Sequence, residues 1–168
     1  LDIDFHDQLP RVVERTGWFG DFHLVGQWFP KIAVLELPGE RGATAPRWNA
    51  HEFHFHSEFY ADYVNYDVKL TVPKGYTVGA VGEEHGAPVE SGDKVTHHFV
   101  QTDVEDFAWV AAPGYKVQRT SWTGPGSPKV DVQVIYPPEY EASAQPVLKA
   151  TTDSLTYFSD PLGPYPYR

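Results

Sequence analysis

The chain has 168 residues, enough for one compact domain, or for one domain and part of a second. Thirteen Lys and Arg against 23 Asp and Glu give a formal net charge of −10, which repels phosphate backbones and argues against a nucleic-acid partner. The absence of Cys excludes disulfides, thiolate nucleophiles and Cys-ligated zinc, and no apolar run reaches the roughly 20 residues of a membrane-spanning helix.

Eight strands are predicted in chain order, each bounded by glycine, proline or polar turn residues. Their ranges are 22–29, 32–37, 66–72, 76–81, 94–102, 107–112, 115–122 and 130–136, and residues 39–46 have the composition of a surface loop. In the clearest strand, Val68, Leu70 and Val72 alternate with polar residues, so one face is buried and the other solvated. The pattern predicts a mainly β fold, with β-sandwich or saddle-like antiparallel sheets.

The last thirty residues change to helical spacing after Pro137 and Pro138. The residues that share one face at this spacing are Leu148, Thr151, Leu155 and Phe158. Because proline is tolerated only at the start of a helix, we expect the well-formed helix to run from about Pro146 to Ser159. We expect no helix of three or more turns between residues 22 and 136. A helix after a long run of strands indicates a second structural unit.

The most prominent polar cluster contains His51, His54, His56 and Glu58. On a strand, the last three would share one face and offer nitrogen and oxygen ligands to a divalent metal. The His-x-His element is similar to that of cupins, but the glutamate follows too closely and no third histidine stands in a glycine-bounded strand. Of the adjacent His97 and His98, only one could face such a site. A polar face or loop is the favoured interpretation, and we predict that His51, His54 and His56 bind no structural metal.

Other catalytic motifs are missing from the sequence. There is no Gly-x-Ser-x-Gly nucleophile elbow and no glycine-rich phosphate loop. His51-Glu52 begins like the zinc-protease motif His-Glu-x-x-His, but position 55 is Phe. Taken alone, the chain offers no recognisable catalytic site.

Four segments, in this order, resemble the aminopeptidase N family of zinc metallopeptidases (gluzincins), in particular a bacterial branch. They are Gly26-Gln-Trp-Phe-Pro-Lys31, Glu58-Phe-Tyr-Ala-Asp62 leading into Tyr66-Asp-Val-Lys-Leu-Thr-Val-Pro73, Asp106-Phe-Ala-Trp109, and the terminal Phe158…Gly163-Pro-Tyr-Pro-Tyr167. The resemblance covers nearly the whole chain.

The resemblance implies two domains. Residues 1–112 would be the later part of a saddle-shaped N-terminal β-domain, and residues 113–168 the opening β-hairpin and first helix of a thermolysin-like catalytic domain. The zinc ligands, the general-base glutamate and the transition-state tyrosine would lie beyond Arg168, and further strands would precede Leu1. On this basis we expect a non-catalytic region of a zinc-dependent aminopeptidase that walls the substrate cleft and binds no cofactor of its own.

The same resemblance implies two partners, namely the remainder of the catalytic domain and a peptide substrate. Without that domain, an apolar surface near the C-terminal helix and residues 107–109 is expected to be exposed. A dimer of the chain through that surface is the expected consequence.

One substrate-binding residue carries over from the family. Its β-domain places a Gln near the free amine of the substrate and, two residues later, a Gln or Glu that binds the ammonium. Gln27 matches the first position, but the second is Phe29, which cannot accept a hydrogen bond. The alternative is that Gln27 satisfies backbone groups in a buried strand. We expect Glu58 to be structural.

Two functions of other classes stay open. An acidic, aromatic-rich β-sandwich could bind carbohydrate on a platform of Trp48, Tyr60 and Tyr63. A small cupin-like metal enzyme would use His54, His56 and Glu58.

Overall fold

The computed structural model of the chain describes residues 1–11, 14–54 and 56–168. The fold is mainly β, with 39% strand and 15% helix, several antiparallel sheets and one C-terminal helix, which confirms the predicted fold class. The chain divides into two compact units. The first contains residues 1–70, 80–87 and 97–109, and the second contains residues 71–79, 88–96 and 110–168.

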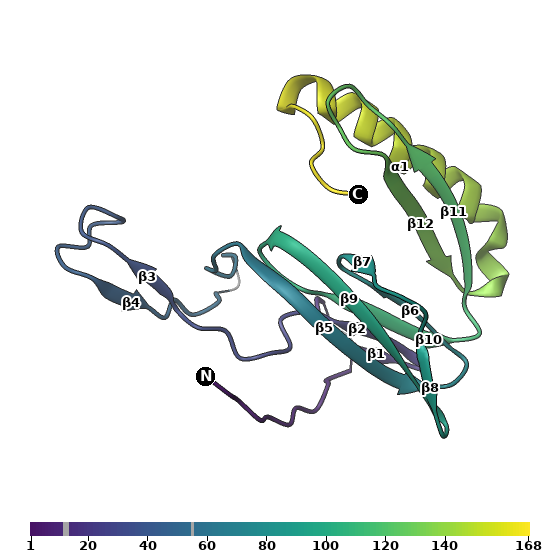
Figure 1. The fold of residues 1–168 in the computed structure, drawn as a ribbon, viewed down its shortest axis with the longest axis horizontal. Helices are drawn as coiled ribbons and strands as arrows, with labels where there is room; N and C mark the ends of the chain where they lie inside the picture. The colour runs from purple at the N-terminus through teal and green to yellow at the C-terminus, as the bar shows by residue number, and fades with distance from the viewer. Residues whose placement is uncertain (12–13, 55) are drawn as a thin grey trace. The chain divides into compact units, whose positions relative to one another are not determined.

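The secondary structure begins with short strands and ends with one long helix (Figure 1). The strands are β1 (Gly17–Phe19), β2 (Phe22–Val25), β3 (Val34–Glu36), β4 (Arg47–Asn49), β5 (Val64–Pro73), β6 (Tyr76–Ala80), β7 (Glu83–Glu84), β8 (Val89–Ser91), β9 (Lys94–Val104), β10 (Trp109–Pro113), β11 (Lys116–Trp122) and β12 (Val130–Tyr136). A 3-10 turn, η1 (Pro138–Tyr140), leads into α1 (Glu141–Leu162). The sheet orders are β1-β2-β10-β6, β5-β9-β7 with β8 also on β9, and the hairpins β3-β4 and β11-β12.

Each predicted strand has a counterpart in the structure, and β2 and β3 are the most shortened relative to the predicted ranges. The strand predicted at 130–136 is β12, and the expected alternation along β5 is confirmed, with Leu70 and Val72 buried between exposed neighbours. By contrast, β2 ends at Val25, because Gln27 has a left-handed φ of 53° that no strand continues through. The described residues between 22 and 136 contain no helix, as expected.

The core of the first unit is aromatic. Phe107 has no exposed surface, and its ring contacts Tyr66 and Phe99 at centroid distances of 5.7 and 6.4 Å. The Trp28 indole Nε1 donates a hydrogen bond to the Phe107 carbonyl at 2.9 Å. Phe107 itself is therefore not part of the apolar surface expected near residues 107–109, because these neighbours enclose its side chain.

The second unit contains α1 lying along the β11–β12 hairpin (Figure 1). Its core is formed by Trp122, Val130, Val132 and Leu148, with Val134 and Leu155 packed against it. The helix begins at Glu141 and not near Pro146, which lies inside it. The residues of α1 before Pro146 are held by the burial of Ala144 and by the ion pair between Lys116 and Glu141 at 2.7 Å.

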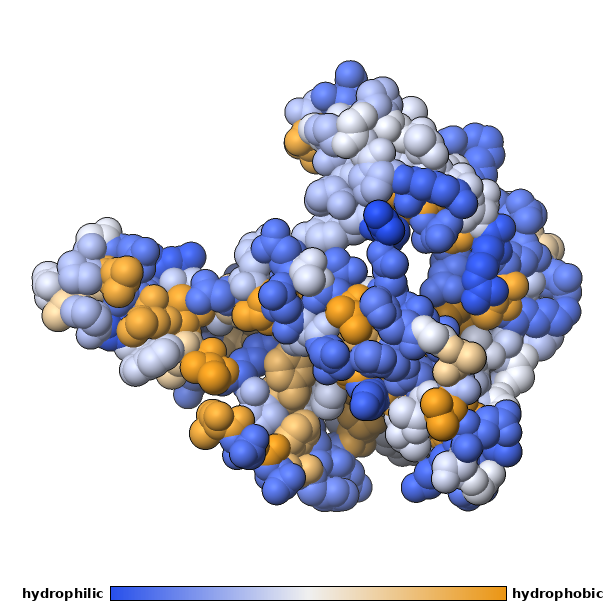
Figure 2. Space-filling model, in the orientation of Figure 1, coloured by the Kyte–Doolittle hydropathy of each residue, from blue (hydrophilic) through white to orange (hydrophobic). Residues whose placement is uncertain are grey.

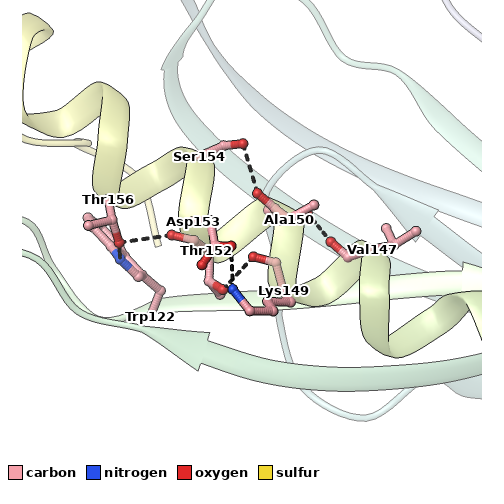
Figure 3. A network of polar contacts seen from close by, with 9 residues as sticks. Trp122, Val147, Lys149, Ala150, Thr152, Asp153, Ser154 and Thr156 are labelled. Carbon is pink, nitrogen blue, oxygen red and sulfur yellow. Dashed lines mark hydrogen bonds and ion pairs between the residues drawn. The ribbon is translucent and has the colours of Figure 1, made fainter.

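The buried face of α1 differs from the predicted one. Leu148 is buried and Leu155 half-buried, as expected, but Thr151 and Phe158 are exposed. The helix instead docks through Ala144, Leu148, Thr152, Leu155 and Ser159. Near the end of the hairpin, the Trp122 indole Nε1 donates to the Thr156 Oγ1 at 2.8 Å (Figure 3). This bond adds a polar contact between β11 and the helix that periodicity alone does not reveal.

The β3–β4 hairpin is held by a buried carboxylate. Glu36 has no exposed surface and accepts hydrogen bonds from Arg47 Nε at 2.7 Å, Asn49 Nδ2 at 2.8 Å and the Tyr60 hydroxyl at 3.2 Å. The hydrogen bonds from Asn49 and Arg47 hold the pKa of Glu36 below its ordinary 4.5. The ionised form is therefore favoured in the folded hairpin.

We expect the hairpin to lose stability in acid. Since the folded pKa of Glu36 lies below its unfolded value, the stabilisation is complete above about pH 4.5 and is lost as the pH falls through the folded pKa. An acid titration of the Trp48 indole signal in β4 should show this transition, and Glu36→Gln should remove its pH dependence. Glu52→Gln, at an exposed neighbouring carboxylate, is the matched control. An unchanged titration in Glu36→Gln would contradict the assignment.

None of the helices in the described part of the chain is long and apolar enough to cross a membrane.

Candidate functional site

Gln27 ties the Gly26–Lys31 segment to Asp106, which precedes β10 (Trp109–Pro113). The Gln27 Nε2 donates a hydrogen bond to Asp106 Oδ2 at 2.5 Å, across 79 positions of sequence. Gln27 is a non-glycine residue with a left-handed backbone conformation. This conformation costs free energy, and such strained residues cluster at active sites and ligand-binding sites. The bond through its nitrogen leaves the amide oxygen as a hydrogen-bond acceptor.

Asp106 is the centre of this contact network. Its carboxylate also accepts a hydrogen bond from the Phe107 backbone N–H at 2.8 Å and pairs with Lys31 Nζ at 3.2 Å. Lys31 Nζ lies over the rings of Phe29 and Phe59, 5.5 and 6.0 Å from their centroids. Two of the segments that carry the family resemblance, 26–31 and 106–109, therefore meet at Asp106.

A groove of about 480 Å³ lies beside this network, within the range of small-molecule sites. Its apolar walls include Phe29, Ile32, Leu35, Trp48, Val64 and Tyr66, and its charged groups are Lys31, Asp62 and Glu105. Trp48 and Leu35 come from the β3–β4 hairpin, over which Figure 2 shows hydrophobic residues at the surface. A third resemblance segment, 58–73, contributes Asp62 and Tyr66.

Tyr66 joins the groove to the core. Its hydroxyl donates to the Glu105 carbonyl at 3.2 Å, and its ring meets Phe29 edge-on at 5.7 Å. Burial, followed by the negative charges of Asp106 and Glu105, raises the pKa of Tyr66 above its ordinary value. The residue therefore stays a neutral phenol at physiological pH.

The histidine cluster lies in a turn and not on a strand. The Ser57 backbone N–H donates to the His54 carbonyl and the His54 N–H to Ser57 Oγ, both at 2.9 Å. Position 55 lies outside the described residues, and no strand places His54, His56 and Glu58 on one face. Glu58 accepts two hydrogen bonds from Arg15, at 2.5 and 2.7 Å, which lower its pKa. This ion pair fits the structural role expected for Glu58.

Of the three aromatic residues in the carbohydrate hypothesis, two are exposed and the third is engaged by other side chains. Trp48 and Tyr63 are 63% and 66% exposed, but Tyr60 bonds Glu36 and has the Arg41 guanidinium 4.1 Å from its ring centroid. One face of Tyr60 is thus already covered by a cation.

The zinc that the resemblance implies finds no fitting ligands in this part of the chain. Within residues 1–11, 14–54 and 56–168, no group of three or more His, Cys, Asp or Glu side chains could hold a metal ion. We therefore assign no catalytic step through zinc to these residues.

Asp106 and Lys31 lie in the segments that carry the family resemblance, but no sequence pattern gives either of them a role. The sequence signal that could have identified them is a charged residue beside an apolar run, since Lys31 precedes 32–37 and Asp106 precedes the buried Phe107.

No family model matches the chain, and no curated protein or solved structure matches it either.

Proposed function

We propose that the chain is a non-catalytic region of a zinc-dependent aminopeptidase-type metallopeptidase and lines the cleft that holds a peptide substrate. The supporting observation is the Gln27–Asp106 contact, which joins two of the resemblance segments. The remainder of a catalytic domain is the proposed protein partner, and a peptide is the proposed substrate.

In this proposal Gln27 orients the peptide by accepting a hydrogen bond from its amine on the amide oxygen. Asp106 keeps the Gln27 amide in that orientation by accepting a hydrogen bond from its nitrogen. A neutral hydrogen bond contributes about 0.5–1.5 kcal/mol, which is enough for binding and orientation but far from the barrier of amide hydrolysis. The zinc and its proton-transfer groups are supplied by another part of the enzyme.

The β11–β12 hairpin with α1 supports the same proposal. A hairpin followed by a helix is the order that the resemblance implies for the opening of the catalytic domain, and β11, β12 and α1 follow one another in that order. This arrangement is common in unrelated folds, so it supports the proposal less than the contact at Gln27 does.

The first test is the reading frame that encodes this chain. We expect it to contain a His-Glu-x-x-His motif downstream of the codon for Arg168, and its absence would refute a zinc-peptidase parent.

The second test is enzymatic. The purified 168-residue chain should release no fluorophore from aminoacyl-amide substrates, with or without added zinc. In the full-length protein, Gln27→Ala should raise KM by up to about tenfold with little change in kcat, because about 1.4 kcal/mol corresponds to tenfold. Gln133→Ala, at an exposed position of β12, is the matched control. Turnover that copurifies with the 168-residue chain would show that the region is catalytic.

A further inference from the structure

Three aromatic side chains, from Phe29, Trp48 and Tyr66, line the groove beside the Gln27 network. Phe29 and Tyr66 meet edge-on at 5.7 Å, and the bond from the Tyr66 hydroxyl to the Glu105 carbonyl holds the second ring in place. Trp48, the third aromatic residue of the lining, is 63% exposed. Aromatic faces attract organic cations, and indole does so most strongly.

The charges of the groove are unbalanced. Lys31 is paired with Asp106 at 3.2 Å, so this pair adds little net charge. Asp62 and Glu105 also line the groove, and neither carboxylate has an ion pair among the described residues. The net charge of −10 further favours the approach of cations.

The walls also restrict the kind of cation. A primary ammonium group carries three N–H donors, and the apolar walls of the groove leave them unsatisfied away from its two exposed carboxylates, Asp62 and Glu105. A nitrogen that carries methyl groups has no N–H to leave unsatisfied, and its methyl groups suit apolar walls. Exposed carboxylates at such a site act at longer range and need no hydrogen bond.

We propose that this groove binds a quaternary ammonium ligand, with Trp48 and Tyr66 beside its methyl groups and Asp62 and Glu105 supplying the negative charge. The proposal goes beyond the cleft-lining function and does not rest on it.

Choline is the probe, and 3,3-dimethylbutan-1-ol is its uncharged analogue of the same shape. In an NMR titration of the 168-residue chain, the choline methyl signal should shift upfield and saturate, whereas the alcohol should bind at least about threefold more weakly. Trp48→Leu and the double variant Asp62→Asn/Glu105→Gln should each weaken choline binding by about 3–10-fold. Trp48→Phe keeps a ring and should retain most of the affinity.

Two control variants lie outside the groove. Trp18→Leu removes another exposed indole, and Asp131→Asn another exposed carboxylate, and both should bind choline like the unchanged chain. Equal binding of the alcohol, an equal loss in Trp18→Leu, or no saturable shift would each overturn the proposal. None of these outcomes bears on the reading-frame motif or on the KM effect of Gln27→Ala, so the two proposals fail separately.

Discussion

Replacement of Phe107 by Ala is expected to destabilise the first unit by about 3–5 kcal/mol, the usual cost of removing a large buried aromatic side chain. Phe107 has no exposed surface, and both Tyr66 and Phe99 lose a ring contact when it is truncated. These two residues come from β5 and β9, so the cavity would open where both strands pack. Since domains are typically stable by only 5–15 kcal/mol, this loss is a large fraction of the total.

The measurement is urea unfolding followed by NMR of the Trp28 indole N–H, which donates to the Phe107 carbonyl. Phe19→Ala is the matched control, because Phe19 is 63% exposed and its truncation should change the free energy of unfolding by about 0.5 kcal/mol or less. Similar midpoints for the two variants would mean that Phe107 is not the centre of this core.

The sequence predicted those elements whose pattern is set locally. The alternation in β5 and β12 is visible because one face of each strand is buried along its length. The short strands β1, β4, β7 and β8 have no such pattern, since two or three residues carry no period and their pairing depends on distant partners. The apolar run 107–112 is typical of a short buried strand, and Phe107 is buried, but no local pattern gives its ring contacts with Tyr66 of β5 and Phe99 of β9.

The candidate site was predictable in part. Gln27 was identified through the resemblance, whereas its partner Asp106 lies 79 positions away and no local rule joins them. The spacing of the histidine cluster allows either a shared strand face or a polar loop, and a polar face or loop is the favoured interpretation. The reciprocal contacts of His54 and Ser57 agree with a loop, which spacing alone does not distinguish from a strand. The Glu36 network was missed because a lone Glu within an apolar run gives no sign of the three donors that surround it.

In the second unit, Leu148→Ala is expected to cost about 2–5 kcal/mol. Leu148 is 3% exposed and is the residue of α1 at the centre of the cluster with Trp122, Val130 and Val132. Only four buried residues form this cluster, so the remaining side chains have little capacity to fill the cavity.

The expected consequence extends to the strands. An isolated two-stranded hairpin is at best marginally stable in water, so β11 and β12 depend on the helix that covers one face of them. Hydrogen exchange should therefore show that the β11–β12 amides and the α1 amides lose protection together in Leu148→Ala. Val147→Ala, at the preceding and 46% exposed position, changes helix propensity and surface without opening the core. If the hairpin amides kept their protection in Leu148→Ala while α1 exchanged freely, the hairpin would be stable without its helix, and the cluster around Leu148 would not be what holds this unit together.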